Sequence, residues 1–135
     1  MSYEISEIEG VGPAYAEKFA TVGIKTTEDL LEKCCDAKGR ATAAEATGFS
    51  ESQVLKFTNM ADLMRISGVA GQYAELMKAS GVDTIKELRT RNAANLAESM
   101  TKVNDEKKLS KGSVTESTVQ KWIDQAKEME PMITH

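Results

Sequence analysis

The chain repeats one stretch of its own sequence, and this repeat constrains the fold more than any other feature. A shift of 58 residues places residues 8–30 on residues 66–88 with nine identical pairs. The residues that recur are Ile8, Gly10, Val11, Tyr15, Ala16, Glu17, Gly23, Thr26 and Leu30. We therefore predict two related units, residues 1–65 and 66–135, that form one compact unit.

Both units have the pattern of short helices joined by tight turns. Pro13 suits the first position of a helix, and Ser50 with Gln53 is typical of a capping box. Residues 36–39 are expected to form a loop. Because the alternation of period 2 that marks strands is absent, we predict an all-α fold. The expected helices cover about residues 13–21, 27–35, 40–47, 51–65, 72–79, 84–91, 93–103 and 116–129.

The second unit is longer than the first. Its last helix aligns only at a shift of 65 residues, which places Ser50 on Thr115 and Phe57 on Trp122. We therefore expect an inserted loop in the polar segment 102–112. Because Phe57 and Trp122 recur at equivalent helical positions, as do Tyr15 and Tyr73, we expect all four rings to pack in the core.

The Gly-Val-Gly turn at residues 10–12 is the first candidate for a binding site. An apolar-Gly-apolar-Gly turn between two short helices is typical of a helix-hairpin-helix motif. Glycine allows positive φ, and the N–H groups at the start of the next helix attract an anion. In such motifs the anion is commonly a DNA phosphate, whose contact reads no base. The candidate nucleic-acid-binding residues are Gly10, Val11, Gly12, Lys18 and Lys25, with Lys102, Lys107, Lys108 and Lys111 of the insertion as a second contact.

A purely structural role of the same turn is the alternative. Glycines also let two helices cross closely, and the lysines of the insertion can simply be solvated. DNA-binding hairpins usually have Lys or Arg after the glycines, whereas this chain has Ala14 and Gln72. In the second copy Ala70 replaces the second glycine. Since a Cβ is unfavourable at positive φ, we expect a regular backbone there. If only one turn binds a phosphate, we expect it to be the first.

The net charge argues against a protein that wraps DNA. The chain carries −4 in total, all of it from residues 1–65, which have 7 basic and 11 acidic side chains against 10 of each in the remainder. Phosphate neutralisation supplies most of the non-specific affinity for DNA. An acidic module for protein–protein interaction or scaffolding therefore stays as the alternative to DNA binding, and seven methionines suit an adaptable contact surface.

The whole series resembles one known family. It comprises Ile-Glu-Gly-Val-Gly-Pro-Ala-Tyr-Ala-Glu-Lys, then Gly-Ile-Lys-Thr-Thr-Glu-Asp-Leu-Leu, then Ile-Ser-Gly-Val-Ala-Gly-Gln-Tyr-Ala-Glu-Leu, and the late Val-Asn-Asp-Glu-Lys-Lys-Leu. From about residue 5 to residue 129 it is similar to the domain-of-unknown-function 4332 family. The resemblance implies a tandem helix-hairpin-helix fold, with two related helical units packed about a pseudo-twofold axis, and no particular activity.

Catalytic motifs are absent from the sequence. The chain has no histidine before His135, no Gly-x-Ser-x-Gly elbow and no phosphate-binding Gly-Lys-Ser/Thr loop. We expect no enzyme activity, no cofactor, no metal and no small-molecule substrate, and we expect Cys34 and Cys35 to be reduced thiols at a helix end. No apolar run reaches the roughly 18 residues of a membrane span. We therefore expect a cytoplasmic protein that binds either the DNA backbone or another protein, and no membrane.

Overall fold

The computed structural model describes residues 2–108 and 114–134. Within these residues the chain is helical, and the prediction of an all-α fold is confirmed. The described residues contain no strand, and only an isolated antiparallel bridge joins Glu4 to Thr26. The helices are η1 (Ile5–Glu7, a 3-10 helix), α1 (Pro13–Ala20), α2 (Thr27–Cys34), α3 (Ala37–Thr47), α4 (Glu51–Leu63), α5 (Gly71–Ala79), α6 (Ile85–Leu88), α7 (Ala93–Lys107) and α8 (Glu116–Glu128).

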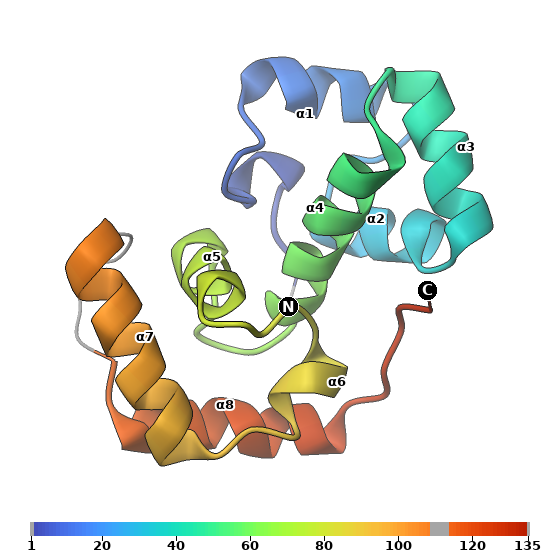
Figure 1. The fold of residues 1–135 in the computed structure, drawn as a ribbon. Helices are drawn as coiled ribbons and strands as arrows, with labels where there is room; N and C mark the ends of the chain where they lie inside the picture. The colour runs from blue at the N-terminus through green and yellow to red at the C-terminus, as the bar shows by residue number, and fades with distance from the viewer. Residues whose placement is uncertain (1, 109–113, 135) are drawn as a thin grey trace.

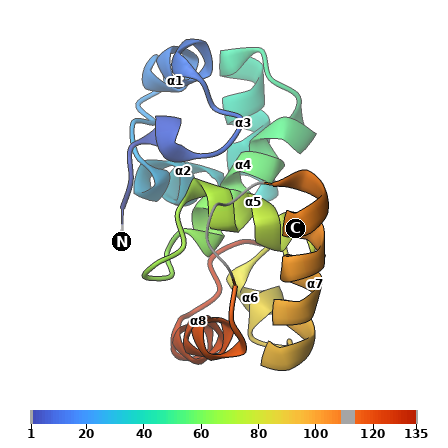
Figure 2. The same ribbon diagram turned by 90° about the vertical axis from the view of Figure 1, so that its left-hand side faces the viewer.

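The helices lie in two groups that follow each other along the chain (Figures 1 and 2). In the first group, η1 to α4, α2 packs against both α3 and α4. In the second group, α5 to α8, α7 packs along α8 and against α5. Contacts between α4 and α5 connect the groups, and the buried apolar side chains of both belong to one core cluster.

Local hydrogen bonds explain where several helices begin. At α4 the Gln53 N–H donates to Ser50 Oγ at 3.1 Å, and the Ser50 N–H donates to Gln53 Oε1 at 3.1 Å. The predicted capping box is therefore confirmed. Thr26 and Asp29 form the same reciprocal arrangement at the start of α2. These contacts depend only on residues three apart, which is why the sequence reveals them.

The predicted loop at residues 36–39 is wrong, because α3 already begins at Ala37. The Asp36 carboxylate accepts the Gly39 N–H at 2.7 Å and so caps the helix three residues earlier than expected. Gly39 occurs inside the helix for a packing reason: a Cβ at this position would collide with the backbone carbonyl of Lys33. The glycine permits close packing of α3 on the end of α2.

The insertion is also more ordered than expected over its first part. Helix α7 continues to Lys107, so residues 102–107 are helical rather than a loop. Glu98 and Lys102, and then Lys102 and Glu106, are spaced four apart and favour a helix. Lys108 ends it with φ 52°. The rest of the expected loop up to residue 112 lies outside the described residues.

Aromatic rings occupy matching places in the two groups. Phe57 and Trp122 are buried, and Tyr15 and Tyr73 are half-buried against the core. The ring centroids of Tyr15 and Phe57 are 6.4 Å apart, and those of Tyr73 and Trp122 are 5.3 Å apart. The prediction that these rings pack in the core is confirmed.

Candidate functional site

The two glycine turns have the same backbone geometry. The Val11 N–H donates to the Ile8 carbonyl at 2.9 Å, and the Val69 N–H donates to the Ile66 carbonyl at 3.1 Å. The third residue of each turn is a glycine with φ +93°. A turn with positive φ at its third position strongly favours glycine there. Gly10 and Gly68 are therefore explained by the turn itself.

Each turn rests on an aromatic side chain of its own group. A Cβ on Gly10 would lie 3.5 Å from a ring carbon of Phe57, and a Cβ on Gly68 would lie 3.4 Å from Trp122 Nε1. The turns thus pack directly on α4 and α8. This contact accounts for the recurrence of glycine and aromatic residue without any ligand.

The second turn has Ala70 where the first has Gly12, but the backbone conformation at the two positions is similar. Ala70 has φ −98° and ψ −172°, and Gly12 has φ −83° and ψ −177°. The regular backbone expected at Ala70 is present, but Gly12 shares it. The expectation that this difference confines a phosphate to the first turn is therefore unsupported, because Gly12 adopts an extended conformation open to any residue.

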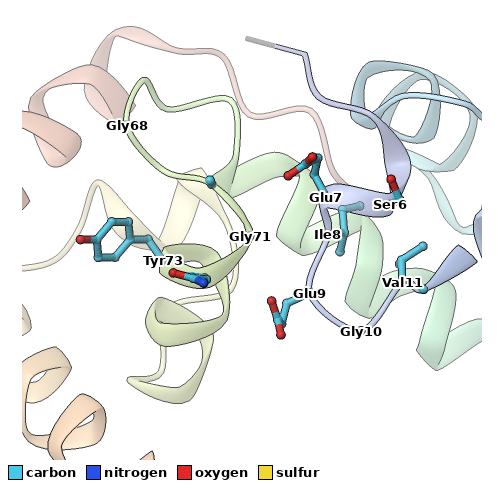
Figure 3. A pocket seen from close by; sticks show the side chains of 12 residues that line it. Ser6, Glu7, Ile8, Glu9, Gly10, Val11, Gly68, Gly71 and Tyr73 are labelled. Atoms are coloured by element: carbon cyan, nitrogen blue, oxygen red, sulfur yellow. The ribbon is translucent and has the colours of Figure 1, made fainter. Parts of the chain in front are cut away.

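The two turns line one hollow of about 660 Å³. Figure 3 shows Glu7 and Glu9 on the side formed by the first turn, with Tyr73 on the opposite side. Both glutamates are exposed, and none of the described residues of the lining is a lysine or arginine. The full lining consists of Ser6, Glu7, Ile8, Glu9, Gly10, Val11, Gly12, Gly68, Ala70, Gly71, Gln72 and Tyr73. Among the described residues, the charged side chains of the lining therefore contribute only negative charge to the field in this hollow.

Gly71 is a residue of this site that the sequence analysis did not single out. It is the first residue of α5, and a Cβ there would overlap the Glu7 carbonyl oxygen and lie 3.2 Å from the Glu9 nitrogen. The start of α5 therefore touches the backbone that leads into the first turn. The repeat places Gly71 on Pro13 of the first unit, and this difference is the signal that could have revealed the contact.

Of the predicted turn residues, Gly10 and Gly12 are exposed and Val11 is buried. Val11 is buried and its N–H is already bonded within the turn, so it has no free N–H for a phosphate. Gly12 is exposed, nothing lies within 4 Å of where its Cβ would be, and no side chain caps the start of α1.

None of the predicted lysines that the structure describes lines the hollow. Lys18 is in the last turn of α1, with its Nζ 5.5 Å from the centre of the Phe49 ring. Lys25 is exposed and its backbone N–H donates to Asp29. Lys102 and Lys107 belong to α7 and Lys108 follows it directly, whereas Lys111 lies outside the described residues. The structure therefore does not gather the predicted cations at the turn.

The cysteines do not form a reactive pair. Cys34 is buried, Cys35 is partly exposed, and both are free thiols. Burial raises the pKa of the Cys34 thiol to about 11. Within the described ranges, no group of three or more His, Cys, Asp or Glu side chains could hold a metal ion. Nor is any helix there long and apolar enough to cross a membrane.

Comparison with known proteins returned a single assignment. No curated protein and no solved structure matches the chain. The sequence model of a domain of unknown function (DUF4332) matches residues 9–129, a span that contains both glycine turns and the helices α1 to α8. As its sequence resemblance predicted, the chain belongs to the DUF4332 family.

Proposed function

We propose that this protein is a non-catalytic interaction module whose hollow between the glycine turns receives a basic segment of a protein partner. The observation that carries the proposal is the lining of that hollow, which has two exposed carboxylates, Glu7 and Glu9, and no lysine or arginine among the residues that the structure describes. A partner with lysine or arginine side chains complements this field, and such complementarity guides both encounter and choice of partner.

The turns are suited to hold this surface in place. Each turn is closed by a hydrogen bond and packs on a buried ring, that of Phe57 or that of Trp122. Both sides of the hollow are therefore attached to buried parts of the fold. Gly71 allows the two sides of the hollow to approach each other, because without a Cβ the start of α5 can contact the backbone at Glu7. A surface held this way loses little conformational entropy when a partner binds, and this favours affinity.

The first test uses a short oligolysine peptide as the probe and ¹⁵N-labelled protein in an NMR titration. We expect chemical-shift changes to concentrate at residues 6–12 and 68–73. The double variant Glu7→Gln, Glu9→Gln should abolish them. The matched control Glu116→Gln, Glu128→Gln removes the same charge from exposed positions of α8 and should leave them unchanged. Shifts of similar size beside carboxylates all over the surface would contradict the proposal.

Binding of a DNA phosphate is the second candidate, and one observation favours it. The start of α1 has no side-chain cap, and the adjoining Gly12 is exposed, so the first N–H groups of the helix are accessible to an anion. The negative lining of the neighbouring hollow and the remote position of the lysines weigh against it.

A labelled DNA duplex tests this second candidate. If about two phosphates are neutralised, the affinity should fall roughly tenfold between 50 and 200 mM salt. Gly12→Glu should abolish binding without disturbing the fold, since its Cβ has free space and its φ suits any residue. Gln72→Glu near the start of α5 is the matched control. Absence of binding at low salt, or equal binding by Gly12→Glu, would rule out a phosphate at α1.

A further inference from the structure

The C-terminal segment after α8 returns to the first group of helices. Residues 129–134, here called the strap, run from the end of α8 to the junction between α2 and α3 (Figure 1). At this junction the Thr134 N–H donates to the Cys35 carbonyl at 2.7 Å. Arg40 Nη2 donates to the Thr134 carbonyl at 2.6 Å. The Thr134 hydroxyl also donates to the Cys35 carbonyl, at 3.5 Å. The end of the strap is thus held by Thr134, through its main chain and its hydroxyl, and by one arginine.

Arg40 is the unusual member of this contact. It is only 5% exposed, and its hydrogen bonds go to two neutral acceptors, the carbonyls of Cys34 and Thr134. No carboxylate of the described residues forms an ion pair with it. A buried charge loses its hydration, and hydrogen bonds to neutral acceptors offset this desolvation penalty only in part. The closed strap therefore stabilises Arg40 through one hydrogen bond while it also shields the guanidinium from water.

The middle of the strap is weakly held. Arg65 Nη1 donates to the Glu130 carbonyl at 3.1 Å, and Glu130, Pro131 and Met132 are exposed. Hollows of about 340 and 390 Å³ lie beside the strap, and Met132 lines both. The apolar contacts of the strap lie near its ends, where Met129 and Ile133 are partly buried against the core. A segment with fewer buried apolar contacts than the helices can open at less than the global unfolding free energy.

We infer that the strap is a releasable latch, closed by Arg40, that opens while the helices stay folded. Opening gives the Arg40 guanidinium access to water, which offsets the lost bond to Thr134. It also removes Met132 from between the two hollows, so that they become one groove beside Leu31, Arg65 and Thr84. The inference is independent of the function proposed for the glycine turns.

Amide hydrogen exchange of the full chain, followed by NMR, tests the latch. The Thr134 amide should exchange through a local opening whose rate is insensitive to low denaturant, whereas the Met60 amide in α4 should exchange only on global unfolding. Arg40→Gln should accelerate exchange at Thr134 roughly tenfold or more, as expected for loss of a hydrogen bond to a charged group. Arg91→Gln is the control, because Arg91 also donates to a carbonyl, that of Gly81, but lies outside the strap contacts.

A second variant keeps the test decisive if Arg40→Gln does not fold. Thr134→Pro removes both donors to Cys35 and changes only an exposed residue of the strap. The heteronuclear NOE of Met132 and Ile133 should fall to values typical of a mobile tail, while the amides of Val119 and Ile123 in α8 keep their protection. If the Thr134 amide instead exchanges with the rate and denaturant dependence of Met60, or if Thr134→Pro removes protection in α8, the strap is an integral part of the fold and the inference is wrong.

Discussion

Gly71 lies directly against the backbone carbonyl of Glu7, and this contact joins the start of α5 to the segment that leads into α1. The two residues are far apart in sequence and belong to different groups of helices. The hollow between the glycine turns exists because these backbones approach so closely. The contact therefore determines the shape of the proposed binding surface.

Gly71→Ala should destabilise the protein, because its Cβ has no room beside Glu7. Overpacking of this kind costs about 1–3 kcal/mol of unfolding free energy. Urea denaturation measures the change. Gly12→Ala is the control and should change stability by less than about 1 kcal/mol, since its Cβ meets nothing within 4 Å. Similar losses in the two variants would show that the contact with Glu7 is unimportant.

Gly10→Ala and Gly68→Ala should each lower the unfolding free energy by about 1–2 kcal/mol, the cost of a side chain in a left-handed conformation. They should differ in one spectroscopic respect. The chain has a single tryptophan, and Trp122 Nε1 is the nearest atom to the new methyl group at position 68. Gly68→Ala should shift the tryptophan emission, and Gly10→Ala, which adjoins Phe57, should not. An equal shift in both would contradict the separate packing of the turns.

Asp29→Asn should reduce the acid sensitivity of the fold. The Lys25 N–H is the main cause that holds the pKa of the Asp29 carboxyl below its usual range, and the bonds with Thr26 add to it. A carboxylate with a lowered pKa in the folded state stabilises the protein above the unfolded value of about 4, and this contribution disappears as the pH falls through the folded value. Urea denaturation at about pH 6 and pH 3 should show a smaller difference for Asp29→Asn than for the wild type. If the difference in unfolding free energy between the two pH values is the same in the variant and the wild type, ionisation of Asp29 does not contribute to stability.

The two cysteines should react very differently with a thiol reagent. Near pH 8 the partly exposed Cys35 should react in the native protein, whereas Cys34, buried and with its pKa raised to about 11, should react only after unfolding. A colorimetric thiol assay with and without guanidinium measures this. Cys35→Ser should abolish the native reaction and Cys34→Ser should preserve it. Rapid reaction of both thiols in the native protein would contradict the burial of Cys34.

Local signals in the sequence predicted much of the secondary structure. The cap at Ser50, the proline that begins α1 and the positive φ of Gly48 at the end of α3 involve residues within one turn of helix. The prediction failed at the start of α3, where Gly39 packs against the backbone of the preceding helix, α2. Gly39 resembles a helix breaker until the backbone of α2 is in place, since only then does its missing Cβ become a packing advantage.

The sequence by itself determined most of the helices, the two glycine turns and the aromatic residues that pack in the core, because these follow from periodicity, capping and the repeat. It did not determine where α3 begins or how far α7 extends. Only the tertiary structure decided that both turns share one hollow, that Glu7 and Glu9 rather than lysines line it, and that Thr134 reaches Arg40. The physical reason is that such contacts depend on how the groups of helices are placed relative to each other. Their placement results from the summed packing of the whole core, which no short stretch of sequence contains.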